Sequence, residues 1–247
     1  MTKYGHDSVM PFEDSSLGKK EQVGMMFDGI ALRYDFLNKL LSGGMDRHWR
    51  NLSVRELMEI NPSRILDVAT GTAEMIIHIA KRLPATEITG IDISEGMLAI
   101  GRKKVQGLKN SGNIHLQIGD SEALAFSNGH FDAIMVAFGV RNFENLENGL
   151  KEMHRVLRNG GKLVILEFSQ PGNSRFRNFC KFYIGRIAPF LVQMFSRKQA
   201  YQYLDKSIQA FPEGKNFIQV MENAGFAGIY QKPLSFGICS IYCGYKS

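Results

Sequence analysis

Apolar residues in the early part of the chain recur with the spacing of an amphipathic helix. Between residues 23 and 41 they lie three or four positions apart, and Gly43-Gly44 follows, as glycines often follow a helix end. A second pattern of this kind covers 46–60 and stops at Asn61-Pro62. Residues 1–20 mix charged residues with Gly and Ser, so we expect a flexible leader there. The pattern predicts two helices behind a leader.

After residue 63 the pattern changes to short apolar runs that alternate with helical stretches. The runs are too short for helices, and turn residues bound them. Alternation of this kind predicts βαβ units and a mostly parallel sheet. The predicted strands cover 64–69, 87–93, 114–118, 131–137 and 162–168, and the predicted helices between them cover 75–82, 95–109 and 145–157.

The end of the chain follows a different pattern. A helix is predicted over 217–224, and two β-rich runs follow, one from Ile229 and one over 236–245. Such runs favour an antiparallel pair at the edge of the sheet. We therefore expect an α/β fold: a Rossmann-like, doubly wound, mostly parallel sheet with an antiparallel edge strand and an N-terminal helical addition. Residues 21–247 would form one domain, with a helical cap inserted at about 172–211.

The predicted insertion has an unusual composition. Residues 168–204 contain no Asp or Glu but six Lys or Arg residues, interleaved with aromatic and aliphatic side chains. A helical cap over a binding site would explain the apolar residues. A basic amphipathic segment also suits peripheral contact with an anionic membrane surface. We expect the segment to serve both purposes.

Overall composition excludes several classes of protein. With 44% hydrophobic and 22% charged residues the chain reads as globular, and no apolar run reaches the roughly 18 residues of a membrane span. The N-terminus lacks the apolar core of a secretory signal, which predicts a cytoplasmic protein. The three cysteines form no CxxC pair and no Cys/His cluster, so we predict no metal site. A net charge of +6 permits an acidic partner without requiring one.

Polar segments follow four successive strands of the predicted sheet. They are 67–73, Asp92, 119–122 and 137–142. Because the carboxyl ends of parallel strands meet at one edge of a sheet, these groups should lie together and bind a ligand there. Asp92 alone could be a helix N-cap, although Ser94 is better placed for that role. Together the four segments predict a nucleotide-like cofactor.

The first of these turns distinguishes between cofactors. A dinucleotide site needs the pattern G-x-G-x-x-G, but the three glycine positions here hold Gly71, Ala73 and Ile76. Asp67, four residues before Gly71, is poorly placed for a pyrophosphate but could order a loop that faces a cationic amino acid. This combination favours S-adenosylmethionine, which carries an amino group, a sulfonium and a ribose.

The sequence as a whole resembles a known group of enzymes. It resembles the class I S-adenosylmethionine-dependent methyltransferases and, within them, the C-methyltransferases of menaquinone and ubiquinone biosynthesis. The glycine turn and Asp92 are general to the superfamily, whereas the Tyr-Asp and Trp-Arg pairs, the Phe-Gly-Val-Arg-Asn run and the 166–171 segment are much more specific to the quinone branch. The motifs that carry the resemblance are Tyr34-Asp35, Trp49-Arg50, the 66–72 and 92–94 turns, Phe138-Gly139-Val140-Arg141-Asn142, the 166–171 segment and Tyr203-Leu204.

The resemblance implies where the cofactor binds. The methionine part of S-adenosylmethionine would lie beside the glycine turn, the ribose hydroxyls would donate to Asp92, and the adenine would lie between polar groups and a methionine lid. Ala73 stands where many relatives carry Gly, and we expect this to tune binding and not abolish it. The expected cofactor-binding residues are Asp67, Gly71, Thr72, Asp92, Met97, Asp120 and Ser121.

The implied reaction is methylation of a ring carbon of a reduced polyprenyl naphthoquinol. The ring becomes nucleophilic when its hydroxyl, with a pKa near ~10, ionises. Arg141 cannot act as a base, but its charge could favour the phenolate, and Asn142 could hydrogen-bond the second ring oxygen. Tyr34 is the third catalytic candidate. An ion pair at the sheet edge remains the alternative for Arg141, and packing remains the alternative for Tyr34.

The sequence is compatible with more than one function. Demethylmenaquinol is favoured as substrate because Thr70-Gly71-Thr72-Ala73 resembles the menaquinone branch, with a polyprenyl benzoquinol as the alternative. An RNA methyltransferase is disfavoured, and no nucleic acid partner is expected, because the basic residues alternate with apolar ones. A non-catalytic cofactor-binding scaffold is a further alternative. A homodimer or association with other quinone-biosynthesis enzymes is compatible with the sequence.

Overall fold

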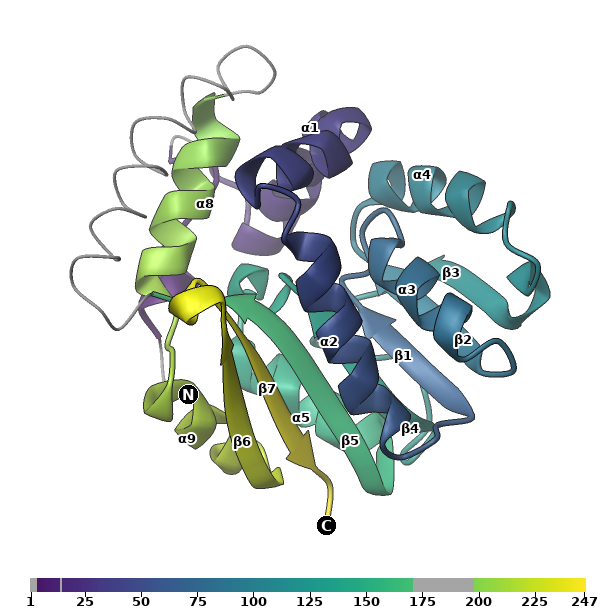
Figure 1. The fold of residues 1–247 in the computed structure, drawn as a ribbon. Helices are drawn as coiled ribbons and strands as arrows, with labels where there is room; N and C mark the ends of the chain where they lie inside the picture. The colour runs from purple at the N-terminus through teal and green to yellow at the C-terminus, as the bar shows by residue number, and fades with distance from the viewer. Residues whose placement is uncertain (1–3, 14, 171–197) are drawn as a thin grey trace.

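The computed structural model describes residues 4–13, 15–170 and 198–247, and it contains one sheet of seven strands in the order β3-β2-β1-β4-β5-β7-β6. Neighbouring strands from β3 to β5 are parallel, whereas β7 is antiparallel to both β5 and β6 (Figure 1). The expected Rossmann-like sheet with an antiparallel edge is confirmed. The strands are β1 (Arg64–Val68), β2 (Glu87–Asp92), β3 (Ile114–Ile118), β4 (Phe131–Ala137), β5 (Leu157–Phe168), β6 (Ala227–Leu234) and β7 (Cys239–Tyr245).

Alternating side chains of the buried strands form two cores, one on each face of the sheet. Ile65 and Met135 belong to the core that α2 (Asp46–Met58) and α3 (Glu74–Arg82) cover. Leu66 and Val136 belong to the opposite core, under α5 (Leu146–Val156) and α9 (Lys215–Asn223). Figure 1 shows α2 in front of the sheet and α5 behind it. This arrangement leaves the carboxyl ends of the strands for the remaining helices.

Three helices lie around that end of the sheet. They are α1 (Lys19–Leu41), α4 (Glu95–Val105) and α8 (Lys198–Ala210), with the short 3-10 helix η3 (Val140–Asn142) directly after β4 (Figure 1). The other 3-10 helices are η1 (Gly5–Ser8), η2 (Ser111–Asn113) and η5 (Ser235–Gly237).

The boundaries differ from the prediction in two places that matter. Helix α1 begins at Lys19, four residues before the first periodic apolar residue, because its first turn is polar and so carries no hydrophobic signal. Strand β5 begins at Leu157, five residues before the predicted start at 162, and runs through Gly160-Gly161. The N–H of Gly160 donates to the carbonyl of Lys246, which extends the pairing through the glycines.

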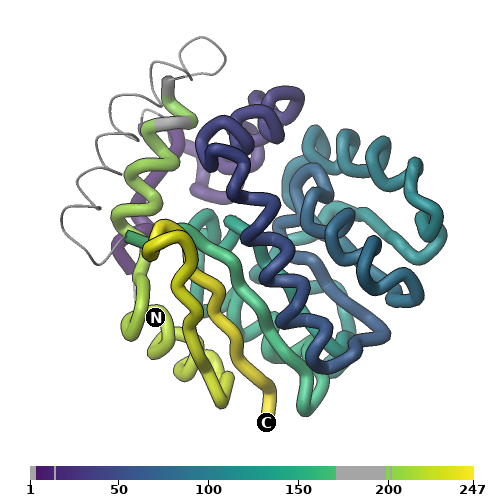
Figure 2. The backbone as a smooth tube through the Cα atoms, viewed as in Figure 1, coloured from purple at the N-terminus to yellow at the C-terminus, as the bar shows by residue number. Residues whose placement is uncertain are grey.

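The expected leader contains residues that pack on the rest of the molecule. His6 is fully buried, and its ring lies 5.4 Å from that of Phe211. The buried ammonium of Lys19 donates to the His6 carbonyl at 2.7 Å. Figure 2 shows this part of the chain running beside α8, which η1 contacts. The described part of the segment is therefore not a free leader, and its few apolar residues gave no sign of this.

Most of the predicted cap insertion, residues 171–197, lies outside the described residues, and its last part forms α8. The basic residues on which the membrane expectation depends are among those not described, apart from the backbone position of Lys198. Among the described helices, none combines the length and the hydropathy that a membrane crossing needs.

Candidate active site

A cavity with an empty volume of about 660 Å³ opens where the sheet order reverses, between the ends of β1 and β4. We call it the first cavity. The loops after these strands approach closely, because a Cβ built on Gly139 would lie 2.7 Å from the Ala69 Cβ. Gly71 and Phe138 both have positive φ, which is common for glycine and rare for an aromatic residue. The first cavity is thus framed by two tightly apposed, unusual turns.

Asp92 connects the first turn to β2 and lines the first cavity. Its carboxylate accepts the Gly71 N–H at 2.8 Å through Oδ2 and the Ser94 N–H at 2.9 Å through Oδ1. Burial raises the pKa of this carboxyl to about 6, although the backbone donors oppose the shift. Ser94 itself caps α4, since its hydroxyl accepts the Met97 N–H, as expected.

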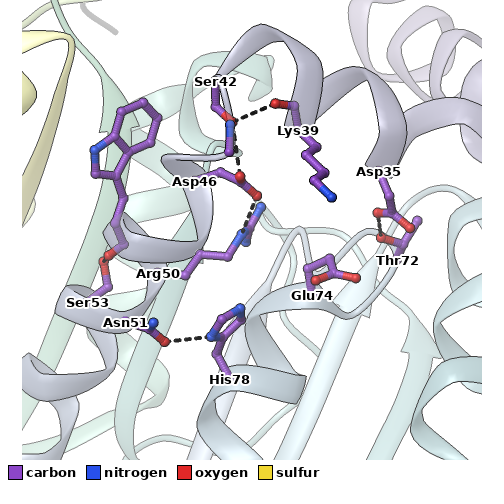
Figure 3. Close-up of polar contacts among 12 residues, drawn as sticks. Asp35, Lys39, Ser42, Asp46, Arg50, Asn51, Ser53, Thr72, Glu74 and His78 are labelled. Atoms are coloured by element: carbon purple, nitrogen blue, oxygen red, sulfur yellow. Dashed lines mark hydrogen bonds and ion pairs between the residues drawn. The ribbon is translucent and has the colours of Figure 1, made fainter.

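Two of the predicted cofactor residues, Asp67 and Thr72, are not among the lining residues of the first cavity. Asp67 is buried and accepts the Thr70 hydroxyl at 2.6 Å, and burial raises its pKa to about 7. The Thr72 hydroxyl donates to Asp35 at 2.5 Å (Figure 3), and it accepts from Lys104 at 3.1 Å. In this structure both side chains order the loop around Gly71.

The other predicted cofactor residues do line the first cavity: Met97, Asp120 and Ser121 join Gly71 and Asp92 there. The Asp120 carboxylate accepts the Lys20 ammonium at 2.6 Å and the Glu122 N–H at 2.9 Å. Five of the seven predicted residues are therefore brought together at one edge of the sheet.

Helix α1 forms one wall and is held in place by polar contacts along its length. At its start Lys20 pairs with Asp120; further on, Asp28 Oδ1 accepts the Ser94 hydroxyl at 2.5 Å and the Gly96 N–H at 2.9 Å. Near its end, Asp35 points at Thr72 (Figure 3). These contacts fix α1 over the carboxyl ends of the strands.

The junction between α1 and α2 is also held by polar contacts. Asp46 accepts the Ser42 hydroxyl at 3.0 Å and lies 4.0 Å from the Nε of Arg50 (Figure 3). The guanidinium of Arg50 lies 5.5 Å from the ring centroid of Phe138. The ring centroids of Trp49 and Phe138 lie 6.3 Å apart. Both residues of the Trp-Arg motif therefore pack against Phe138, in the turn that follows β4.

A second cavity, with an empty volume of about 600 Å³, adjoins the first. Phe27, Tyr34, Phe138 and Asn142 line both cavities, so one space continues into the other. The remaining lining of the second cavity is largely apolar: Met26, Ile30, Leu37, Asn38, Leu41, Arg141, Phe168, Ala200, Tyr203 and Leu204. All three predicted catalytic residues, Tyr34, Arg141 and Asn142, line it.

Arg141 is both paired and exposed to the second cavity. One of its terminal nitrogens donates to Glu167 Oε1 at 2.7 Å and to the Phe138 carbonyl at 2.6 Å. The Glu167 side chain is fully buried, and burial raises the pKa of its carboxyl. The Arg141 guanidinium also lies 5.4 Å from the ring centroid of Phe168. Arg141 thus forms an ion pair, as in the alternative considered for it, and it also lines the second cavity.

Comparison with known proteins identifies the family. A model of the ubiE/COQ5 methyltransferase family matches residues 16–246. The chain belongs to this family. It is 43% identical over 229 residues to the ubiquinone/menaquinone biosynthesis C-methyltransferase UbiE of Geobacter sulfurreducens, covering 92% of this chain and 90% of the relative. It is 42% identical over 245 residues to the demethylmenaquinone methyltransferase of Bacteroides fragilis, covering 98% and 99% respectively.

Solved structures with this fold are more distant in sequence. The [4+2]-cyclase SpnF has a TM-score of 0.67 at 17% identity, over 92% of this chain and 96% of its own. Phosphoethanolamine N-methyltransferase 2 of Haemonchus contortus, solved with S-adenosyl-L-methionine, has a TM-score of 0.64 at 13% identity, over 95% of this chain and 61% of its own. At these identities the likeness establishes the fold alone.

Three polar atoms of this methyltransferase are buried around the second cavity without a hydrogen-bond partner among the described residues. They are Arg141 Nε, Asn142 Oδ1 and the Tyr203 hydroxyl oxygen. Buried polar groups are nearly always paired in native proteins, so such a cluster calls for an explanation. Within the described ranges, no group of three or more His, Cys, Asp or Glu residues could hold a metal ion.

Sequence reasoning missed Glu167, Asp28 and Tyr203 as parts of this methyltransferase site. Glu167 did give a signal, because it directly follows the apolar run 163–166 of a predicted strand, and a charged residue there must find a buried partner. Tyr203 belongs to a motif of the family resemblance, but nothing in the sequence placed it or Asp28 in the site, since each acts across elements that are distant in sequence.

Proposed function

We propose that this methyltransferase transfers a methyl group to a ring carbon of demethylmenaquinol, with S-adenosylmethionine as the donor. One observation carries the proposal: a cavity lined by the glycine turn and Asp92 continues into an apolar cavity that contains Arg141 and Asn142. A polar ligand and an apolar aromatic ring could therefore meet at the shared wall.

The first cavity fits the cofactor that the family uses. The Gly71 turn has no side chain to obstruct it, and Asp92 Oδ1 and Oδ2 retain lone pairs beyond the two backbone hydrogen bonds, which would suit ribose hydroxyls. Asp120 and Ser121 would border the adenine, with Met97 beside it. Bound there, S-adenosylmethionine supplies a methyl group on a positively charged sulfur. Asp67 and Thr72 would assist indirectly, by holding the loop.

The residues of the second cavity would prepare the quinol. The ring carbon attacks only when an adjacent hydroxyl loses its proton, which would pass to water, and a hydrogen-bond donor beside that oxygen lowers its pKa. The methyl group then replaces the hydrogen on that ring carbon, which would leave as a proton and restore the aromatic ring. Glu167 offsets much of the charge of Arg141, but the Nε–H of Arg141 has no partner in the described part of the chain and would donate to the oxygen. The unpaired Oδ1 of Asn142 would accept the second ring hydroxyl. A quinone has no hydroxyl hydrogen to offer Asn142, so the site would favour the reduced form.

Tyr34 and the surrounding rings would orient the substrate and exclude water. Tyr34 borders both cavities, and its ring packs edge-on against Phe27 with the centroids 5.8 Å apart. Phe138 and Phe168 also line the second cavity, with their ring centroids 4.6 Å apart. An in-line approach of carbon to methyl needs such rigid walls.

The names of the relatives support a naphthoquinol substrate. The relatives from Bacteroides fragilis and Porphyromonas gingivalis are named demethylmenaquinone methyltransferases, whereas the Geobacter relative is named for ubiquinone and menaquinone together. The polyprenyl benzoquinol therefore remains the second candidate substrate.

The decisive experiment is a mass-spectrometric assay of the purified protein with S-adenosylmethionine and chemically reduced, short-tail demethylmenaquinone. We expect a product heavier by one methyl group, and none when the quinone is left oxidised. A reduced short-tail benzoquinone precursor serves as the competing substrate. Methylation of the benzoquinol alone would move the assignment to ubiquinone biosynthesis. Cofactor binding without methylation of either quinol would favour the scaffold role and contradict the proposal.

The insoluble tail of the substrate leads us to propose peripheral contact with the inner face of the membrane. The basic residues expected to make it, Arg175, Arg177 and Lys181, lie outside the described residues. Replacing all three with Ala should reduce sedimentation with anionic vesicles, and unchanged sedimentation would leave the segment as a cap only. A homodimer or a complex with other quinone-biosynthesis enzymes would be sought by light scattering and by co-purification.

A further inference from the structure

Tyr203 on α8 carries an unexplained polar group. Its side chain is 3% exposed and lines the second cavity, and its hydroxyl has no hydrogen-bond partner among the described residues. A buried hydroxyl without a partner destabilises the folded state, so its retention needs an explanation, and a ligand that completes it is one. Phenylalanine would fill the same space at no such cost.

The position of the ring is fixed by packing, so the hydroxyl is not free to turn toward solvent. Tyr203 forms a small core with Val23 and Met26 of α1, and Phe27 and Ala200 pack against it. The ring thus joins α8 to the helix that carries Tyr34. A donor fixed in this way needs no reorganisation when charge develops beside it.

The charges around Tyr203 define what it can do. Burial raises the pKa of its hydroxyl far above the usual value; the positive charge of Arg141 acts in the opposite direction, and the Glu167 carboxylate adds to the increase. The hydroxyl therefore keeps its proton at neutral pH and acts as a donor, and it cannot serve as a base. Its neighbour Arg141 offers a second unpaired donor, the Nε–H.

We propose that the Tyr203 hydroxyl donates a hydrogen bond to the quinol oxygen that ionises during methylation, together with the Arg141 Nε–H. This inference rests on the proposed function. Two donors would stabilise the phenolate, and the Asn142 Oδ1 acceptor would hold the hydroxyl on the other side of the ring. Hydrogen bonds to a charged oxygen are stronger than those to a neutral one, so the contribution of Tyr203 grows as the phenolate forms. Tyr203 is thereby a substrate-binding residue that assists ionisation.

The test compares Tyr203→Phe with Tyr242→Phe. Tyr242 is equally buried, but its hydroxyl accepts the Gly214 N–H at 2.9 Å and Gln231 Nε2 at 3.1 Å, away from both cavities. We expect Tyr203→Phe to keep or raise the melting temperature and to keep the affinity for S-adenosylmethionine. Its kcat/KM for reduced short-tail demethylmenaquinone should fall about 10- to 100-fold. Tyr242→Phe should show the reverse pattern, a lower melting temperature with normal turnover.

A pH profile separates substrate contact from packing. The limb of the kcat profile that reports quinol ionisation should move to higher pH in Tyr203→Phe, because the phenolate has lost a donor. Unchanged turnover and an unchanged limb would overturn the proposal. If the wild-type protein methylates no quinol, the proposed function fails separately, and binding of the reduced short-tail quinone in the presence of S-adenosylhomocysteine tests Tyr203 instead. Equal affinities of wild type and Tyr203→Phe would then reject it.

Discussion

The two cavities of the active site differ in how their polar groups are satisfied. In the first cavity, the carboxylates of Asp92, Asp120 and Glu122 all accept hydrogen bonds from backbone N–H groups. In the second cavity, Arg141 Nε, Asn142 Oδ1 and the Tyr203 hydroxyl have no partner among the described residues. The first cavity is thus formed before any ligand arrives, whereas the second contains polar groups that no described residue completes and that a ligand could. A preformed cofactor site beside an incomplete substrate site favours ordered binding, with the cofactor first.

The cavities also differ in their origin along the chain. The first is built mainly from turns that follow β1, β2, β3 and β4, so each contribution is a short local motif. The second draws on α1, η3, the end of β5 and α8, which lie up to 178 residues apart, from Met26 to Leu204. A site assembled from such distant segments depends on tertiary packing, which makes it more sensitive to changes in the elements that support it.

The largest effect is expected from Arg141→Ala, which tests the second cavity directly. Turnover should fall about 10²- to 10³-fold, as it does when a donor to a developing oxyanion is removed, with little change in the affinity for S-adenosylmethionine. Steady-state assays and calorimetric titration measure the two quantities. A matched loss of cofactor affinity would show that the two cavities do not act separately.

The same substitution leaves Glu167 buried without its partner, which costs about 3–5 kcal/mol of stability. The double variant Arg141→Ala/Glu167→Gln is therefore the control, because it removes the uncompensated charge. Stability should recover in the double variant while turnover stays low. Arg158→Ala, which breaks an ion pair with Asp132 at the opposite end of the sheet, should leave turnover unchanged. Recovery of turnover in the double variant would mean that Arg141 is only structural.

A second effect concerns the buried acid under the first cavity. Burial raises the pKa of Asp67 to about 7 in the folded state, from 3.8 as the unperturbed value. The folded protein therefore binds this proton more tightly than the unfolded chain, and the free energy of unfolding falls as the pH rises between these values. The free energy of unfolding stays reduced at pH values above the pKa that Asp67 has in the folded state. Asp67→Asn should remove this contribution and gain about 2–4 kcal/mol relative to wild type at about pH 8.

Urea denaturation from about pH 4 to about pH 8 measures this difference without ligand. The two proteins should be nearly equally stable at the acidic end and diverge as the pH rises. Because Asp67 does not line the cavity, cofactor affinity should change little. Parallel stability curves would show that Asp67 is ionised at no cost, which would undermine its assignment as a buried loop-ordering acid.

The difference in origin explains what the sequence could predict. Each strand from β1 to β4 was predicted within one residue of its observed bounds, because buried parallel strands are short, apolar and bounded by turns. Gly71 and Asp92 could be assigned to a cavity because each directly follows a strand, and strand ends fix position. The start of α1 at Lys19 could not be predicted, because a lysine in the sequence indicates an exposed position, whereas this one is buried and donates to the His6 carbonyl.

The candidate site shows the same limit. Thr72 was expected beside the cofactor, but its hydroxyl points to Asp35 of α1, a contact across 37 residues that no local pattern encodes. The pairing of Arg141 with Glu167 depends on register in the sheet and on a turn with positive φ at Phe138. Tyr203 is one aromatic residue among many in an apolar stretch. Its unpaired hydroxyl is a property of the folded structure alone.

A third effect is expected at Asp92, which lines the first cavity and orders its turn. Asp92→Ala removes an acceptor for the cofactor and the partner of the Gly71 N–H, and it should weaken S-adenosylmethionine binding by about 1–3 kcal/mol. Calorimetric titration gives the value, with Asp67→Asn as the control acid outside the cavity. At saturating cofactor, turnover should approach that of wild type. Unchanged affinity would remove Asp92 from the ribose site.

The smallest effect is expected at the outer edge of the first cavity, where Lys20 pairs with Asp120. Both side chains are about one third exposed, at 33% and 32%, so solvent screens their attraction and the pair contributes under about 1 kcal/mol. Lys20→Ala should weaken cofactor binding slightly, because α1 loses one of its ties to the sheet while Asp28 and Asp35 retain theirs. The difference from wild type should shrink further at high salt, where charges as exposed as these interact little.

Titrations at low and high salt measure this difference in cofactor affinity. Lys206→Ala, which breaks an exposed pair with Glu13 away from the cavity, is the matched control. A loss as large as that in Asp92→Ala would show that the first cavity is not preformed and depends on α1 as strongly as the second cavity does.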